Sequence, residues 1–166
     1  GFVRLCVRNK IMNNEEIKYR FFVNGKLSKW HDSEFIINGL NFSGIEQYMM
    51  YMKAVTFGDS EIADKIMSEL NPAKQKELGR HVNNYNDSIW STIRYDIVKK
   101  GIIEKFKQNK DLQEYLKNLK GYTIVEASPY DRIWGIGFEE DDALENIDNW
   151  GQNLLGKILT DLANNL

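Results

Sequence analysis

The residues best suited to chemistry lie in the loop from residue 128 to residue 138. Aromatic and apolar side chains crowd around two glycines there: Tyr130, Ile133, Trp134 and Phe138, with Gly135 and Gly137. Aromatic rings stack on flat heterocycles, and glycines let the backbone approach a ligand closely. Such a loop either packs into the core or lines a pocket. Trp134 and Gly135 are therefore candidate ligand contacts.

Asp131 is the carboxylate of this loop, three residues before Trp134. Apolar surroundings raise the pKa of a carboxyl by desolvation, which suits it to acid–base catalysis. The competing interpretation is an Asp that bonds its own backbone in a turn after Pro129, which is the commoner use of the residue. Both interpretations stay open at this point.

Glu46 is the second candidate carboxylate. Ser43-Gly44-Ile45-Glu46 has the spacing of a capping box, in which the Ser and Glu side chains bond the helix start. The same residue heads an apolar helix, and Lys53 follows roughly 10 Å further along the same face at 1.5 Å per residue. A Glu and a Lys on one stripe, with Met50 between them, also fit a pocket wall.

Three further side chains have both a structural and a functional interpretation. Arg80 follows Gly79, so it is either a cation at a helix C-terminus or a ligand for phosphate. Trp90 lies on an apolar helical stripe, where a core position is commoner than a stacking platform. Asn24 lies in a cluster that is by default a turn.

The elements that must position these residues are mostly helices. Asn38-Gly39 between two apolar runs predicts a β-hairpin. Apolar spacing and capping residues predict helices and strands elsewhere: helices after Ser43, Ser60, Asn71 and Asn86 or Asp87, then over 102–109, 111–119 and 153–163, with strands over 3–8, 19–23 and 122–127. The tract 11–16 reads as a turn. We expect one predominantly helical α+β domain with a small sheet and hairpin, compact and without a linker.

Composition excludes several classes of protein. The 166 residues carry a formal net charge of −2, whereas a dedicated duplex-binding protein needs a basic excess. Cys6 is the only cysteine and His31 and His81 are the only histidines, so we expect no internal disulfide and no metal site. Neither an apolar run of about 18 residues nor a secretory signal pattern occurs. We expect a cytoplasmic protein without membrane, metal or redox cofactor.

Several motifs occur together in an order that is typical of one family. They are Phe21-Phe22-x-Asn24-Gly25-x-Leu27-Ser28-x-Trp30, Phe42-Ser43-x-x-Glu46-Gln47-Tyr48, Lys53-Ala54-x-x-Phe57-Gly58-Asp59, Gly79-Arg80-x-Val82, Trp90-x-x-x-Arg94, Lys105-Phe106-x-Gln108-Asn109, Val125-Glu126-Ala127-Ser128-Pro129-x-Asp131-x-x-Trp134-Gly135-Ile136-Gly137 and Trp150-Gly151-Gln152-Asn153-x-Leu155-Gly156. The series resembles the NADAR superfamily, which includes the YbiA-like N-glycosidases of riboflavin intermediates. The resemblance runs from residue 19 to residue 166, and residues 1–18 form an N-terminal extension outside it.

The resemblance implies a hydrolase that cleaves an N-glycosidic bond in a ribosylated heterocycle, of the ribosylaminopyrimidine phosphate type of riboflavin biosynthesis, in a metabolite damage-control role. Two alternatives remain: a glycohydrolase that removes ADP-ribose from guanine, and a non-catalytic sensor of NAD or ADP-ribose. The partner is thus a nucleotide-like small molecule or an ADP-ribosylated nucleobase, and the oligomeric state stays open. Lys29 and Trp30 depart from the family pattern, where Asn followed by an aromatic residue is commoner, and the last helix lacks an expected basic residue.

The resemblance also assigns roles to residues. Family functional positions match at Glu46, Asp131 and Trp134, which we take as the catalytic set. Glu46 would activate the water, and Asp131 would bind the ribose hydroxyls or supply the proton, although the two roles are interchangeable. Trp134, with or without Trp90, would stack the heterocycle. The substrate-binding set comprises Asn24, Lys53, Arg80, Trp90 and Gly135, with Arg80 and Lys53 on the phosphate.

Overall fold

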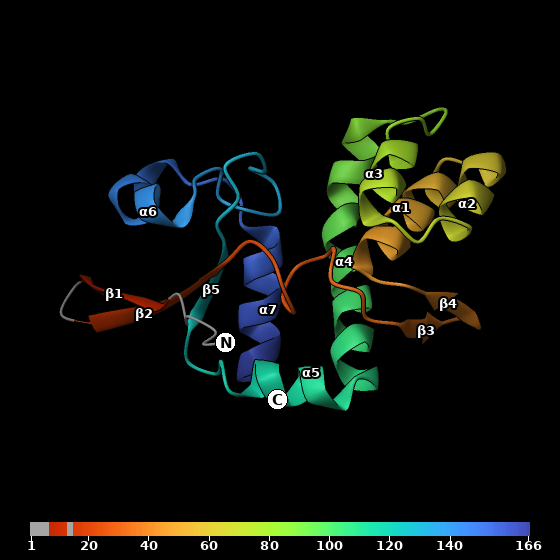
Figure 1. Ribbon diagram of the computed structural model, residues 1–166. Helices are drawn as coiled ribbons and strands as arrows, with labels where there is room; N and C mark the ends of the chain where they lie inside the picture. Colours follow the sequence, from red (N-terminus) through yellow and green to blue (C-terminus); the bar gives the residue numbers. More distant parts are fainter. Residues whose placement is uncertain (1–6, 13–14) are drawn as a thin grey trace. The chain divides into compact units, whose positions relative to one another are not determined.

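The computed structural model describes residues 7–12 and 15–166, and the chain divides into two compact units (Figure 1). One unit comprises the described residues up to Ser28 and those from Gln113 to Leu166; we call it the sheet unit. The other runs from Lys29 to Leu112, and we call it the helical unit. The predominantly helical α+β class predicted from the sequence is confirmed. No helix in the described ranges combines the length and apolar character of a membrane span.

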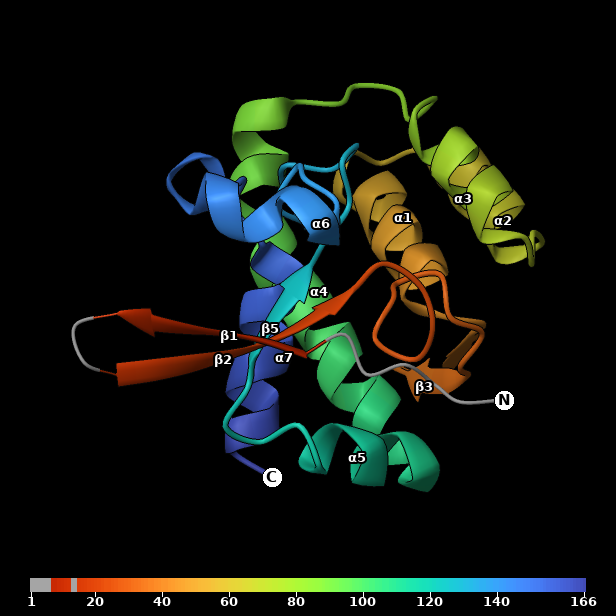
Figure 2. The ribbon, with the colours of Figure 1, turned by 60° about the vertical axis from the view of Figure 1, so that its left-hand side comes forward.

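Three strands form the sheet of the sheet unit. β1 (Val7–Met12) pairs antiparallel with β2 (Glu15–Phe22), and β2 pairs parallel with β5 (Thr123–Glu126). The parallel register runs from Tyr19 opposite Thr123 to Phe22 opposite Glu126, so the first half of β2 pairs with β1 alone. Figure 2 shows this hairpin extending past the end of β5.

An aromatic core lies against this sheet. Tyr19 and Phe21 on β2 pack with Val125 and Ile136, and the Trp150 ring meets both β2 rings edge-on at centroid distances of 5.7 and 6.2 Å. Beside them follow α6 (Glu140–Ala143) and the 3-10 helix η1 (Leu144–Asn149). The loop predicted from chemistry, residues 128–138, therefore begins at the end of β5 and returns to the core at Ile136.

α7 (Leu154–Asn164) takes the place of a neighbouring strand along β5. The Asn153 side chain accepts a hydrogen bond from Glu126 N at 3.0 Å and donates one to Ile124 O at 3.1 Å. Thr160 Oγ1 accepts from Ile124 N at 2.9 Å. These bonds satisfy backbone groups that a further strand would otherwise pair.

In the helical unit, β3 (Phe35–Ile37) and β4 (Leu40–Phe42) form the hairpin predicted around Asn38-Gly39. Both turn residues have positive φ, 51° and 79°, as a type I′ turn requires. The helices that follow are α1 (Ile45–Thr56), α2 (Ser60–Met67), α3 (Pro72–Gly79) and α4 (Asp87–Gln108). α5 (Lys110–Lys117) then leads back to the sheet unit.

Three boundaries differ from the sequence-based expectation. The helix expected over 102–109 is part of α4, which runs through Gly101, where an added Cβ would meet the Tyr48 ring at 2.6 Å. The strand expected over 3–8 is observed as β1 from Val7, and its first four positions lie outside the described residues. In the tract 11–16, expected as a turn, residues 11–12 belong to β1 and residues 15–16 to β2, and residues 13–14 lie outside the described residues.

Candidate functional site

Glu46 lies in the first turn of α1, but the capping box predicted with Ser43 does not form. Gly44 occupies the N-cap position, and the Ser43 hydroxyl accepts from Gln75 Nε2 at 3.3 Å. The backbone N–H of Ser43 is taken by Gln47 Oε1 at 2.7 Å. Gln47 therefore supplies the backbone bond at the helix entry, and the structural explanation for Glu46 offered by its spacing is wrong.

Lys29 is the residue that faces Glu46. Its Nζ lies 3.9 Å from Glu46 Oε2, and both side chains are buried, with exposed fractions of 9% and 3%. The backbone joins the same two residues, since Glu46 N donates to Lys29 O at 3.0 Å. Sequence reasoning missed this partner, because it marked Lys29 only as a departure from the family pattern.

The helical unit also brings Lys53 and Arg80 toward Glu46. Burial lowers the pKa of Lys53; the charge of Glu46 raises it and that of Arg80 lowers it further, so all three groups lie within electrostatic reach. The end of α3 approaches α1 closely, since a side chain at Gly79 would collide with Met50. That contact places Arg80, which is exposed, beyond the helix end.

Tyr85 lies beside Lys53, and Arg94 lies within electrostatic reach of Tyr85. The Lys53 ammonium lies 4.5 Å from the centroid of the Tyr85 ring, and the Tyr85 hydroxyl donates to Asp87 at 2.8 Å. Burial and the Asp87 bond raise the pKa of Tyr85, against the opposing charge of Arg94. Arg94 Nε is buried without a hydrogen-bond partner among the described residues. Arg94 is a further candidate ligand for an anion, one turn after Trp90.

In the sheet unit, Asp131 makes the turn that was its structural interpretation. Its Oδ1 accepts hydrogen bonds from Ile133 N at 2.9 Å and Trp134 N at 2.8 Å. Trp134 is buried, and its carbonyl accepts from Leu155 N at 3.2 Å. The carboxylate of Asp131 thus fixes the backbone of the loop immediately before Trp134.

Gly135 lets this loop lie against the end of β5. A Cβ at Gly135 would lie 2.8 Å from Glu126 O and 3.0 Å from Asp131 O, so no other residue fits without movement. Glu126 itself is a buried carboxylate beside the loop, 7% exposed, and its carbonyl accepts from Ile136 N at 3.0 Å. Sequence reasoning did not select Glu126, although a carboxylate at the end of an apolar strand was a usable signal.

The two remaining candidates differ in exposure. Trp90 is 5% exposed on α4, which agrees with its core interpretation. Asn24 is exposed in the turn after β2, where Gly25 has a φ of 85° and its carbonyl accepts from Ser28 N at 2.9 Å. The helical unit thus gathers Glu46, Lys53 and Arg80, and the sheet unit gathers Asp131, Trp134 and Gly135 in one loop.

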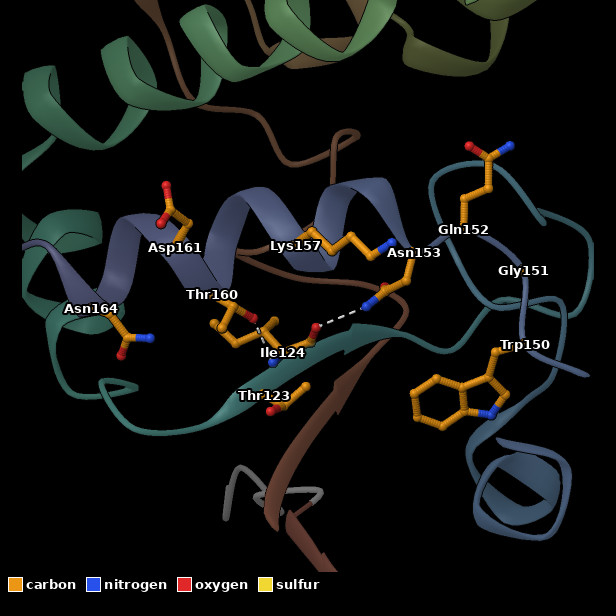
Figure 3. A pocket seen from close by; sticks show the side chains of 10 residues that line it. All are labelled: Thr123, Ile124, Trp150, Gly151, Gln152, Asn153, Lys157, Thr160, Asp161 and Asn164. Atoms are coloured by element: carbon orange, nitrogen blue, oxygen red, sulfur yellow. Dashed lines mark hydrogen bonds between the residues drawn. The ribbon is translucent and has the colours of Figure 1, made fainter. Parts of the chain in front are cut away.

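A groove of about 510 Å³ lies along α7 and β5, with Trp150 and Lys157 in its wall (Figure 3). None of the candidate catalytic residues lines it. Asn153 and Thr160 do line it, but their side chains are already hydrogen-bonded to the backbone of β5. We therefore do not assign the chemistry to this groove. Within the described residues, no cluster of three or more His, Cys, Asp or Glu side chains is arranged to hold a metal ion.

Comparison with known proteins defines the class. The fold matches the NMR structure of the E. coli protein YbiA with a TM-score of 0.72 at 21% identity, over 87% of this chain and 82% of that one. The sequence model of the NADAR domain matches residues 13–166. The chain therefore belongs to the NADAR domain family, and the single match spans both compact units.

Two curated relatives carry functional names. The chain is 45% identical over 139 residues to N-glycosidase R617 of Acanthamoeba polyphaga mimivirus, covering 80% of this chain and 82% of that protein. It is 27% identical over 158 residues to riboflavin biosynthesis protein VVA0006 of Vibrio vulnificus. That second alignment covers 93% of this chain but 40% of the relative.

Proposed function

We propose that this protein hydrolyses the N-glycosidic bond of a ribosylated heterocycle, with Glu46 as the group that activates water. The observation that carries the proposal is the buried Glu46 carboxylate, which is not used for helix capping and lies beside the Lys29 ammonium. Membership of the NADAR family and the name of the R617 relative support the reaction class.

The reaction makes defined demands on these groups. The bond between the ribose C1 and the base nitrogen breaks with its electron pair going to nitrogen, so positive charge grows on the sugar. Glu46 takes a proton from water, whose oxygen bonds to C1, while a second group protonates the leaving nitrogen. A carboxylate near C1 also stabilises the cationic transition state electrostatically.

Asp131 is our second catalytic candidate, either as the proton donor or as the ligand of the ribose hydroxyls. Because Oδ1 holds the backbone of residues 133 and 134, the carboxylate has a fixed orientation at little entropic cost. Trp134 and Gly135, in the same loop, are proposed to contact the heterocycle. Trp134 is 6% exposed, so only a small part of the ring can meet a ligand.

Lys53 and Arg80 are proposed to bind the substrate phosphate, with Arg94 as a third cation. An Arg guanidinium offers paired donors to phosphate oxygens, and a buried Nε without a partner in Arg94 fits an anion ligand. Substrate binding would neutralise charge around Tyr85, where Lys53 and Arg94 both act.

For the substrate we favour a ribosylaminopyrimidine phosphate, since the VVA0006 relative is named for riboflavin biosynthesis. ADP-ribosylated guanine is the second candidate, because three cations rather than one suit a diphosphate.

Liquid chromatography and mass spectrometry of reactions with each compound, and with NAD, test the choice. Free base from the pyrimidine substrate supports the proposal, and release only from the guanine conjugate selects the alternative. Tight binding without any product would make the protein a sensor and overturn hydrolysis.

A further inference from the structure

We infer that Lys29 is a positioning residue that keeps the Glu46 carboxylate charged and oriented for water activation; this inference rests on the role proposed for Glu46. Neither the structural match to YbiA nor the family match gives Lys29 a role. Lys29 is not proposed to contact the substrate. Its effect passes through Glu46.

The geometry ties Lys29 to Glu46 twice. Its ammonium lies 3.9 Å from the carboxylate, and its carbonyl accepts the N–H of Glu46 at 3.0 Å. A Cβ at Gly44 would lie 2.9 Å from His31 O, so the segment that starts at Lys29 runs directly against the beginning of α1. Backbone and side chain therefore hold Glu46 from the same segment.

The charge of Lys29 matters for the ionisation of Glu46 because Glu46 is only 2% exposed. A carboxyl removed from water favours its neutral form unless a nearby cation or donor stabilises the anion, and a neutral carboxylic acid cannot accept a proton from water. The N-terminal dipole of α1 favours the anion as well. An ammonium within ion-pair distance adds a local cation that the dipole alone does not provide.

The other cations of the helical unit are less suited to this task. Lys53 is two helical turns away along α1, roughly 10 Å by helix geometry. Burial lowers the pKa of Lys53; the charge of Glu46 raises that pKa and the charge of Arg80 lowers it, and the net effect is a weaker hold on the ammonium proton. Arg80 is exposed, and its Nη1 lies 3.4 Å from Glu77, so solvent and Glu77 screen its charge. Lys29 is buried and its ammonium lies 3.9 Å from Glu46 Oε2, whereas burial lowers the pKa of Lys105, the other buried lysine of this unit, to about 7.

The test compares Lys29→Met with Lys29→Arg, and with Lys65→Met as the matched loss of an exposed Lys–Glu pair in the same unit. The substrate is the compound that wild type cleaves, and kcat and KM are measured from pH 5 to pH 9. For Lys29→Met we expect the acidic limb of kcat to move up by about one pH unit or more, the effect of losing an adjacent opposite charge. If the pKa of Glu46 in Lys29→Met lies above 7, kcat measured at pH 7 should fall about tenfold for each pH unit between 7 and that pKa. KM should change little.

Lys29→Arg should restore the limb, and Lys65→Met should leave it in place. A uniform loss of kcat without movement of the limb, or a fall in melting temperature with an unchanged limb, would overturn the inference and leave Lys29 as a structural residue. Lys29→Gln, which keeps a donor without the charge, replaces Lys29→Met if the latter does not fold.

A measurement independent of catalysis separates the two ideas. The Glu46 carboxyl signal in protein labelled at glutamate, assigned with Glu46→Gln, is followed by NMR titration. It should remain ionised at pH 7 in wild type and take up a proton at higher pH in Lys29→Met. A carboxyl already protonated at pH 7 in wild type would refute the inference without any variant. A shifted titration in a protein that cleaves no substrate would instead refute the proposed function.

Discussion

Environment, rather than residue type, distinguishes Glu46, Asp131 and Glu126, three of the buried or half-buried carboxylates among the described residues. Glu46 faces a buried ammonium, and Asp131 is bonded by two backbone N–H groups. Glu126 ends a strand under the Asp131 loop, close to the position of a Cβ at Gly135. An ion pair favours a charged base, whereas two backbone bonds favour a fixed orientation. These surroundings suit Glu46 to proton transfer and Asp131 to holding substrate.

Asp131→Asn tests whether the Asp131 charge matters beyond the turn. Asn keeps an oxygen that can accept from Ile133 and Trp134, so we expect the melting temperature to stay close to that of wild type. Turnover should fall about 100-fold, because the charge near the reacting sugar is gone. Steady-state kinetics and a thermal melt check both expectations.

Asp131→Ala is the companion variant, because it also removes both turn bonds. It should lose melting temperature as well as turnover. Wild-type turnover in Asp131→Asn would reduce Asp131 to its turn, and would leave Glu46 as the only catalytic carboxylate of our proposal.

At this scale the sequence allowed Glu46, Asp131 and Trp134 to be proposed as site residues, and their catalytic roles stay predictions. The spacing of Ser43 and Glu46 suggested a capping box. In the structure the Glu46 carboxylate instead faces Lys29, seventeen positions earlier in the chain. Such a pair depends on how the segment after Lys29 folds back on α1, which local periodicity does not encode. The turn at Asp131 was foreseeable, because the two backbone N–H donors to its carboxylate are two and three residues away.

Among the elements, α7 is unusual because side chains of this helix and of its N-cap residue form hydrogen bonds with the backbone along one edge of β5. Asn153 has left-handed φ of 49°, and its amide bonds Glu126 N and Ile124 O. Thr160 covers Ile124 N from the next turns of the helix. The strand that carries Glu126 toward the Asp131 loop is thereby held in register.

We expect Asn153→Ala to lower the free energy of unfolding by about 2–4 kcal/mol, since it leaves a buried N–H and a buried carbonyl without their partner. Asn164→Ala is the control on the same helix: its side chain bonds Gly121 N at the surface, and the loss should stay below about 1 kcal/mol. Chemical denaturation measures both. Equal losses in the two variants would contradict the role assigned to Asn153.

Local signals predicted the elements well where the cause is local. Asn38-Gly39 formed its hairpin, Asn71 caps α3 with Pro72 behind it, and Asn86 caps α4. Gly101 does not separate the helix expected over 102–109 from α4, and its lack of a side chain makes room for the Tyr48 ring. That reason comes from the packing of α1 against α4 and is invisible to a window of sequence.

For the molecule as a whole, Lys105 is the least favourable charge among the described residues for which a pKa shift is resolved. It is fully buried on α4, and burial lowers the pKa of Lys105 to about 7. In the unfolded chain a lysine keeps a pKa near 10.4. Between these values the unfolded state binds more protons than the folded state, so stability rises with pH across this window.

Lys105→Met removes this titration. Relative to that variant, the free energy of unfolding of wild type should rise by about 1 kcal/mol per pH unit between pH 7 and pH 10. Below pH 7 the full cost of the buried charge is present, so wild type should be the less stable of the two. Urea denaturation at several pH values measures the difference, and a difference independent of pH would show that Lys105 keeps the same pKa in the folded and the unfolded chain.

Fold and family could be predicted from residue 19 onward, because the motifs occur there in the order typical of the family. The family match begins slightly earlier, at residue 13. Substrate identity could not be predicted, because a fold shared at 21% identity leaves the contacts of a ligand undetermined. The cations around Tyr85 depend on three separate helices and loops, which only the folded chain assembles.

The most direct test of the account is the rate at which Glu46→Gln releases free base, measured beside wild type on the substrate that wild type cleaves. Gln keeps the size of Glu and removes the charge, so the fold should persist by circular dichroism. We predict equimolar base and ribosyl product from wild type, and a kcat at least about 100-fold lower for the variant. Wild-type turnover in a folded Glu46→Gln protein would contradict the central claim that Glu46 activates the water.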